Sequence, residues 1–173
     1  MYRTICLILT LLCIIFFFSP LYPVFSFKET RINNPQTFYI NVTKEKKFEI
    51  QYTHSIHLSD VNEMYEITNT NEMQLLSMGY EDVAIGMPAS AEEGQTITYE
   101  NGKYKLEFLD RKINSFVLLI GDIDTKLEFL YCGNRFDLKD SLERGKSYEF
   151  EVSRISLFDK LKGVSIAYED ENR

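Results

Sequence analysis

The sequence is poor in the residues from which common sites and scaffolds are built. Its 173 residues include two histidines and three cysteines, which leaves little material for a zinc ribbon or a disulfide framework. Four prolines and eight glycines exclude a collagen-like or low-complexity chain. Basic residues are in deficit, with 19 Lys and Arg against 26 Asp and Glu and a formal net charge of −7. This balance argues against nucleic-acid binding, because phosphate contacts need a basic surface.

Catalytic motifs are missing as well. No G-x-S-x-G elbow, P-loop or C-x-x-C pair occurs in the chain, so an enzymatic function has no motif to support it. What the chain does have is ordinary, since 45% of its residues are hydrophobic and its length suffices for one domain with a real core. These features are typical of a single acidic globular domain.

The most apolar segment lies at the N-terminus. After Arg3, residues 5–18 form a run of 14 with a single polar member. This run is shorter than the about 20 residues of a membrane-spanning helix and fits the apolar region of a signal peptide. Pro20 and Pro23 end it. We predict that residues 1–26 are a signal peptide, with an uncleaved membrane anchor as the alternative. The remainder is then exported to the cell surface or beyond, and touches the membrane only through this segment.

Export bears on the cysteines. Cys6 and Cys13 fall inside the apolar run, which leaves Cys132 as the only cysteine in the sequence beyond it. A single cysteine cannot form an internal disulfide. We expect Cys132 to be a small buried residue at the end of a strand.

The rest of the chain has the pattern of a β protein. Residues 27–46 are polar and irregular and are predicted to be a spacer that ends in a short strand at 38–40. Beyond it, period-two alternation or short apolar runs bounded by turn residues predict nine strands, at 48–54, 62–68, 73–80, 95–99, 103–109, 113–120, 126–131, 135–138 and 147–153. The fold class is therefore all-β, an antiparallel sandwich or barrel of eight or nine short strands within residues 47–156.

Three details of this pattern are more specific. Residues 113–120 are apolar almost throughout, so burial on both faces is expected there. Asn101-Gly102 lies between two strand segments, which is a strong hairpin signal. Single helical turns are expected within 140–144 and 157–161, the second of them in a C-terminal tail at 157–173.

Both histidines of the chain lie in one polar segment with acidic residues close behind. One hypothesis is a metal site made of His54, His57 and either Asp60 or Glu63. A second makes Ser55 a nucleophile that is activated by His54, although adjacent side chains on a strand diverge. The third is structural, with His54 ending a strand, forming a hydrogen bond with an acid across the sheet and fixing a loop. The structural interpretation is the simplest of the three.

Residues 77–88 are the other unusual stretch, because they mix glycine, methionine and tyrosine without alternation. A glycine-rich loop beside a β scaffold can contact a ligand or a partner. The plainer interpretation is a crossover between two sheets, in which Gly79 and Gly86 adopt positive φ angles.

Taken together, several stretches of the chain resemble one known family, the domain of unknown function 1850. The resemblance covers about residues 46–154 and is carried by Phe48-x-Ile50-x-Tyr52-Thr53-His54-Ser55, Glu63-Met64-Tyr65-Glu66-Ile67, the strand and Gly-Met-Pro loop of 75–88, Asn101-Gly102-Lys103-Tyr104, and 133–138. It implies a small exported bacterial protein, found beside tripartite ATP-independent (TRAP) transporters that use TAXI-type solute receptors. It implies no activity and no cofactor. Any shared function is placed at the matching positions, which are His54, Ser55, Glu63, Gly86, Met87 and Pro88.

The resemblance and the residues together predict a non-enzymatic accessory protein of a TRAP-type (TAXI) solute transporter. It would bind the transporter permease or its receptor by protein–protein contact around His54 and Gly86. The alternative is an extracytoplasmic module that binds a small ligand or a metal ion at His54 and Glu63. An exported hydrolase that uses Ser55 and His54 is a third hypothesis.

Overall fold

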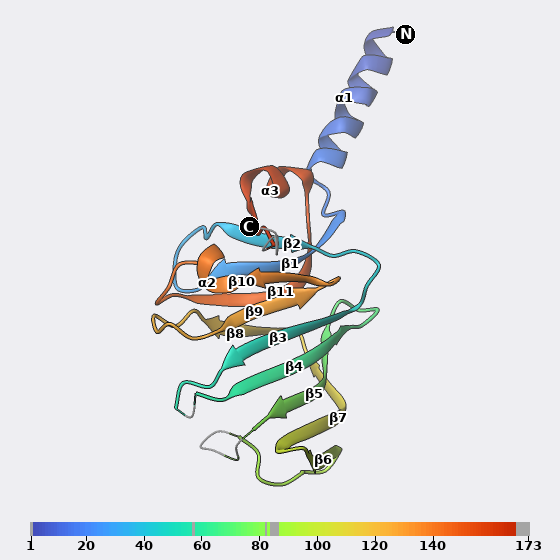
Figure 1. The fold of residues 1–173 in the computed structure, drawn as a ribbon. Helices are drawn as coiled ribbons and strands as arrows, with labels where there is room; N and C mark the ends of the chain where they lie inside the picture. The colour runs from blue at the N-terminus through green and yellow to red at the C-terminus, as the bar shows by residue number, and fades with distance from the viewer. Residues whose placement is uncertain (1, 57, 82, 84–86, 169–173) are drawn as a thin grey trace.

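The computed structural model describes residues 2–56, 58–81, 83 and 87–168. An N-terminal helix, α1 (Tyr2–Phe18), projects away from a β structure built of two sheets (Figure 1). Within the described residues, no helix has both the length and the apolar character needed to cross a membrane.

The two sheets are predominantly antiparallel and pack face to face. In the described part, one sheet has five strands in the order β12-β2-β1-β11-β8, which are Val164–Ser165, Thr37–Asn41, Tyr22–Glu29, Ser147–Ile155 and Ser115–Leu119. The other has seven in the order β10-β9-β3-β4-β5-β7-β6, which are Asn134–Asp137, Leu127–Tyr131, Lys47–Thr53, Asp60–Ile67, Met73–Tyr80, Lys103–Ile113 and Gln95–Glu100. Neither sheet closes on itself, so the fold is an open sandwich.

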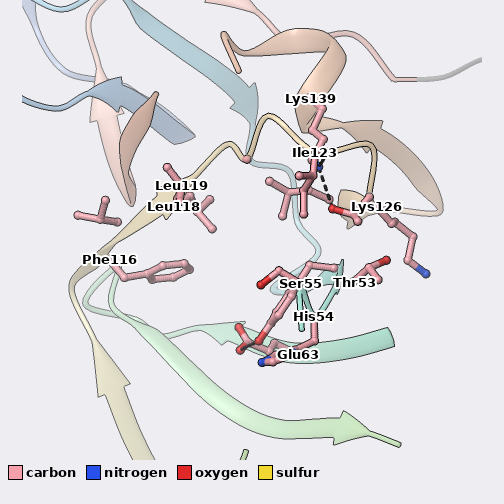
Figure 2. Close-up of a pocket in the computed structure, with 15 residues that line it drawn as sticks. Thr53, His54, Ser55, Glu63, Phe116, Leu118, Leu119, Ile123, Lys126 and Lys139 are labelled. Atoms are coloured by element: carbon pink, nitrogen blue, oxygen red, sulfur yellow. Dashed lines mark hydrogen bonds between the residues drawn. The ribbon is translucent and has the colours of Figure 1, made fainter. Parts of the chain in front are cut away.

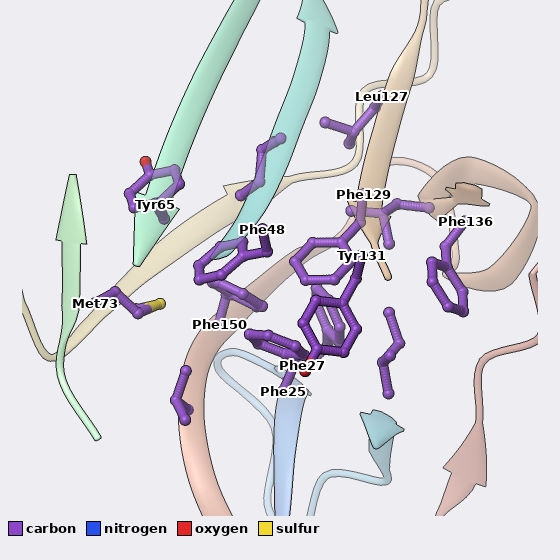
Figure 3. Close-up of a cluster of buried hydrophobic side chains, with 14 of the residues drawn as sticks. Phe25, Phe27, Phe48, Tyr65, Met73, Leu127, Phe129, Tyr131, Phe136 and Phe150 are labelled. Carbon is purple, nitrogen blue, oxygen red and sulfur yellow. The ribbon is translucent and has the colours of Figure 1, made fainter. Parts of the chain in front are cut away.

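The core between the sheets is rich in aromatic rings, as Figure 3 shows. Phe25 of β1 is fully buried and packs edge-on against Phe48 and Phe129 of the opposite sheet, with ring centroids 4.9 and 4.8 Å apart. Phe48 stacks on Tyr65 at 5.1 Å. Aromatic pairs in edge-to-face or offset-stacked geometry stabilise a core beyond the contribution of their buried apolar area. This cluster therefore helps to hold the two sheets together.

The all-β prediction is confirmed, and all nine predicted strands are present as β3 to β11. Residues 38–40, the expected short strand, belong to β2. Helix α2 (Leu138–Ser141) begins two residues before the turn expected at 140–144, and α3 (Leu157–Lys162) matches the turn expected at 157–161. The hairpin at Asn101-Gly102 joins β6 to β7, and both residues have positive φ angles.

The predicted domain boundaries differ from the structure at both ends. The boundary after residue 26 falls inside β1, and the predicted spacer at 27–46 carries the last three residues of that strand and all of β2. The predicted tail at 157–173 contains α3 and β12, and Ile166 is buried. Residues 22–25 lie between the apolar N-terminal run and the predicted boundary, so the sequence assigns them to the signal peptide.

Four narrower expectations are wrong. Gly79 lies within β5 and does not have a positive φ angle, and the stretch at 77–88 leads from β5 to β6 of the same sheet, so it is not a crossover between two sheets.

β8 is partly buried on its inner face only, because Phe116 and Leu118 pack against the core between the sheets, whereas Val117 and Leu119 on the outer face of the sheet are exposed. Cys132 is exposed rather than buried. It occupies the two-residue turn between β9 and β10 with a φ of 52°, followed by Gly133 at 74°, which is the geometry of a tight hairpin.

Candidate functional site: a cavity between the sheets

The loop after β3 is short and tightly closed. The His54 amide donates to the Ser59 carbonyl oxygen at 2.8 Å, and the Leu58 amide donates to the His54 carbonyl oxygen at 2.9 Å. Leu58 adopts a left-handed φ of 53°, which lets the chain reverse within so few residues. This closure fixes His54 and Ser55 at the end of the seven-stranded sheet.

A cavity of about 390 Å³ lies beside this loop, between β3 and β4 on one side and β8 on the other. We call it the inter-sheet cavity. Figure 2 shows Phe116 and Leu118 along one wall, Glu63 and His54 along the opposite wall, and Lys139 entering at one end. It is lined by Tyr52, Thr53, His54, Ser55, Glu63, Phe116, Val117, Leu118, Leu119, Gly121, Ile123, Thr125, Lys126, Leu127 and Lys139.

Glu63 lies on the inner face of β4, between the buried residues Val61 and Tyr65. Both carboxylate oxygens accept hydrogen bonds from tyrosines: Tyr52 donates to Oε1 at 3.2 Å, and Tyr65 donates to Oε2 at 2.6 Å. Burial, and next the nearby negative charge of Glu63, raise the pKa of each phenol well above its ordinary value. Both phenols therefore stay protonated and remain donors, which compensates for placing a charge on the inner face of a sheet.

Lys139, on α2, is 8% exposed. Its ammonium donates to the Ile123 carbonyl oxygen at 2.6 Å and to Thr125 Oγ1 at 3.0 Å. Both acceptors are neutral, and among the described residues no carboxylate lies within ion-pair distance of Nζ. Burial, and next the positive charge of Arg144, lower the pKa of Lys139, while the charges of Asp137 and Asp124 oppose this shift.

Lys126, the other lysine of the cavity lining, has a carboxylate partner. Its ammonium is 2.8 Å from Asp60 Oδ2, which places an acid beside it at the mouth of the loop. The hydrogen bond from Lys126 is also the main reason that the pKa of Asp60 is lowered. The two lysines thus present one paired and one unpaired charge to the cavity.

The structure brings three of the predicted site residues together, because His54, Ser55 and Glu63 all line the inter-sheet cavity. His54 Nδ1 accepts a hydrogen bond from the Ile56 amide at 3.4 Å, so the imidazole also supports its own loop. Within the described residues, no three His, Cys, Asp or Glu side chains are grouped as metal ligands would be. His57, which the metal hypothesis uses, lies outside the described residues.

The other three predicted residues belong to a different part of the sandwich. Gly86 lies outside the described residues, so its predicted positive φ is not described either. Met87 packs against the core and shares a second hollow with Pro88, Met78 and Leu106. The Pro88 carbonyl oxygen accepts a hydrogen bond from the buried Tyr80 hydroxyl at 2.7 Å.

The sequence interpretation missed Tyr52, Lys139 and the β8 wall as parts of the site. A signal for the polar cluster was present, since alternation over Val61, Glu63, Tyr65 and Ile67 puts the acid on the apolar face. Lys139 is more than 70 residues from Glu63 in the sequence and comes to the cavity only through the packing of α2. No local pattern identifies such a residue.

Comparison with known proteins adds one relationship. The family model described as "Domain of unknown function (DUF1850)" matches residues 48–138, more than half of the chain, and this stretch contains every strand from β3 to β10. It also contains Glu63, whereas Lys139 follows directly after it. No curated protein and no solved structure matches the chain.

Proposed function

The chain belongs to the DUF1850 family, and we propose that it is an exported, non-enzymatic binding protein that holds a small amphipathic anion in the inter-sheet cavity. The observation that carries this proposal is the unpaired ammonium of Lys139 at one end of a cavity with an apolar wall. A carboxylate with a short apolar chain would complement both features: its negative charge would pair with the Lys139 ammonium, and its chain would cover the apolar wall.

The sign of the ligand charge follows from which charges are already satisfied. Glu63 accepts two tyrosine hydrogen bonds, and Lys126 is paired with Asp60. Lys139 has two neutral acceptors only, and an ammonium carries three donors. An anion that takes the third donor gains a charge-assisted hydrogen bond in a partly desolvated site, where such bonds are strong.

The apolar part of the ligand is assigned to the β8 side of the cavity. Phe116 and Leu118 point between the sheets from this strand and pack against the core. A site in which most of the lining is apolar and a few polar groups set the orientation is the usual form of a small-molecule pocket. The cavity volume of about 390 Å³ falls within the range of such pockets, roughly 300–1,000 Å³.

Titration calorimetry with butanoate, hexanoate and octanoate tests this function, with octanamide as the uncharged counterpart of octanoate. We expect heat for the carboxylates that grows with chain length, and none for octanamide. Lys139→Met should lose octanoate binding by tenfold or more, about 1.4 kcal/mol. The control is Lys105→Met, which removes an exposed lysine of β7 that is paired with Glu107.

Absence of heat for every carboxylate, or equal binding to folded Lys139→Met, overturns the proposal. The octanamide sample also tests the non-enzymatic part of it, because octanamide carries an amide bond and should be recovered unchanged after prolonged incubation. Release of octanoate and ammonia from octanamide would instead support the hydrolase hypothesis for Ser55 and His54.

We also propose a partner, namely a TRAP-type permease or a TAXI-type solute receptor that docks at the loops after β3 and β5. This is supported by their placement, because Thr53 pairs with Asp60 and Val61 pairs with Tyr80, so both loops leave the same end of the sheet (Figure 1). Cross-linking in native membranes followed by pull-down should recover the permease or the receptor, and recovery should fall for Ser55→Arg. Recovery of neither overturns this partner without affecting the calorimetric result.

A further inference from the structure

Strand β1 begins only three residues after α1 ends and is a central element of the fold. It pairs with β11 at eight consecutive positions and with β2 on its other side. Val24, Phe25 and Phe27 are all 0% exposed. Cleavage after residue 26, where the sequence predicts a boundary, would divide this strand and remove Phe25 from the aromatic core.

Helix α3 packs against the base of α1. The ring of Phe158 lies 5.2 Å from that of Phe18 and 6.0 Å from that of Phe17, centroid to centroid. A capping box between Ser156 and Asp159 starts α3, in which the two side chains exchange hydrogen bonds with each other's backbone amides. Figure 1 shows α3 at the edge of the domain from which α1 projects.

The position of α3 on the sheet is fixed by close packing. The Tyr39 hydroxyl donates to the Lys160 carbonyl oxygen at 3.2 Å. Gly163 comes so near to β2 that a Cβ atom there would lie 2.7 Å from the Thr37 carbonyl oxygen. Val24, Tyr39 and Ile155 form a small buried cluster on this outer face of the sheet. Helix α3 is thus held in a defined place beside α1.

The surface made by these two helices is apolar and basic. Every residue of α1 has some exposure, and its side chains are almost all apolar. On α3, Leu161 lies one turn beyond Phe158 on the same helix face and is 72% exposed. Lys160 and Lys162 are the basic residues of its last turn, while its acid, Asp159, is engaged in the capping box. This local charge contrasts with the net charge of −7 for the whole chain.

We propose that the exported protein keeps α1, and that α1 and α3 together form a surface that binds anionic lipid. In this arrangement α1 enters the apolar phase, Leu161 lies at the interface, and Lys162 faces the anionic headgroups. The lipid is chosen over a protein partner because α3 continues the apolar surface of α1 and carries the complementary charge. The proposal is independent of ligand binding in the inter-sheet cavity.

The retention of α1 is tested by intact-mass and N-terminal analysis of the full chain after expression in an export-competent bacterial host. We expect the N-terminus of α1 to be present in the mature, folded protein. A folded mature protein that begins anywhere beyond α1 overturns the proposal.

The lipid contact is tested with a fluorescent reporter, because the chain contains no tryptophan. Leu161→Trp provides a single reporter on α3, and Leu109→Trp is the control at an 80% exposed site on β7, far from α1 in Figure 1. The full chain is reconstituted into vesicles of brominated phosphatidylcholine with phosphatidylglycerol. We expect quenching and a blue shift for the α3 reporter and neither for the control.

The charge contribution is tested in the same vesicles with a matched pair of reversals. Lys162→Glu, added to the α3 reporter, should remove roughly half of the quenching or more, because each basic residue near an anionic surface contributes measurably to binding. Lys105→Glu, on β7, should leave it unchanged. An unquenched α3 reporter in vesicle-bound protein, equal quenching of both reporters, or equal effects of both reversals overturns the proposal.

Discussion

The hydroxyl of Tyr65 donates a 2.6 Å hydrogen bond to Oε2 of Glu63, which lies two residues earlier on the same inner face of β4. An acid on the core face of a strand is costly unless its oxygens have donors. The tyrosine that stacks on Phe48 in the core is also one of the donors that make the polar wall of the cavity stable. Core packing and site chemistry therefore depend on the same residue.

Removing this donor should destabilise the domain. Tyr65→Phe keeps the ring stacking and leaves one carboxylate oxygen without its donor, so the free energy of unfolding should fall by about 1–3 kcal/mol. Urea denaturation followed by circular dichroism measures the change. Tyr99→Phe, at a tyrosine that is 60% exposed, is the matched control and should change stability by less than about 0.5 kcal/mol.

The same tyrosines predict how stability depends on pH. Burial raises the pKa of Tyr52 and Tyr65 in the folded protein above the value near 10 that a tyrosine has in the unfolded chain. The folded state then holds these protons more tightly, so their contribution is fully present below pH 10 and is lost as the pH rises above it. Denaturation series from pH 8 to 11 should show this decline in the native chain. It should be smaller in Tyr65→Phe, and identical slopes for the two proteins would contradict the assignment.

Strand β1 predicts where the N-terminus can be shortened. A chain that starts at Leu21 retains all of β1 and should fold, whereas one that starts at Phe27 lacks the first five residues of the strand, Phe25 among them, and should not. Phe25→Ala in the full chain should cost about 3–5 kcal/mol, as expected for a large buried aromatic residue. Near-ultraviolet circular dichroism and urea titration distinguish these outcomes. A stable, cooperatively unfolding domain from residue 27 onward would contradict the role given to β1.

The one-sided burial of β8 predicts a large loss of folding stability for truncation at one position and a small loss at the next. Phe116 lies 5.1 Å from the Phe150 ring and 5.8 Å from the Tyr65 ring, so Phe116→Ala should destabilise by about 3 kcal/mol. Val117 is 60% exposed, and Val117→Ala should cost less than about 0.5 kcal/mol. Equal losses at the two positions in denaturant titrations would show that both faces of the strand are covered.

The sequence allows the strands and the two short helices to be predicted well and the terminal parts less well. β5 runs over the same residues, 73–80, that are predicted for it, because a short and largely apolar run bounded by turn residues is itself a local signal for a strand. β1 is not predicted from the sequence, because Tyr22 to Phe25 lie between the apolar run and the predicted boundary after residue 26 and are assigned to the signal peptide. Its strand character comes from β2 and β11, which pair with it from distant parts of the chain.

The candidate site divides in the same way. His54, Ser55 and Glu63 were predicted together because they lie close in the sequence, and they do line one cavity. Met87 and Pro88 were grouped with them, but these two residues line a separate hollow and contact the core and Tyr80 instead. Loops that leave the same end of a sheet need not turn to the same side, and that direction is set by packing.

By itself, the sequence determined the fold class, most strand boundaries and the polar segment around His54, because period-two alternation and turn residues are local properties. Only the tertiary structure decided three further points. It made the residues after the apolar run a central strand, brought Lys139 and β8 to the cavity opposite Glu63, and placed α3 against α1. Each of these depends on contacts between residues far apart in the chain. The local sequence pattern around a residue does not show which distant residues it will contact.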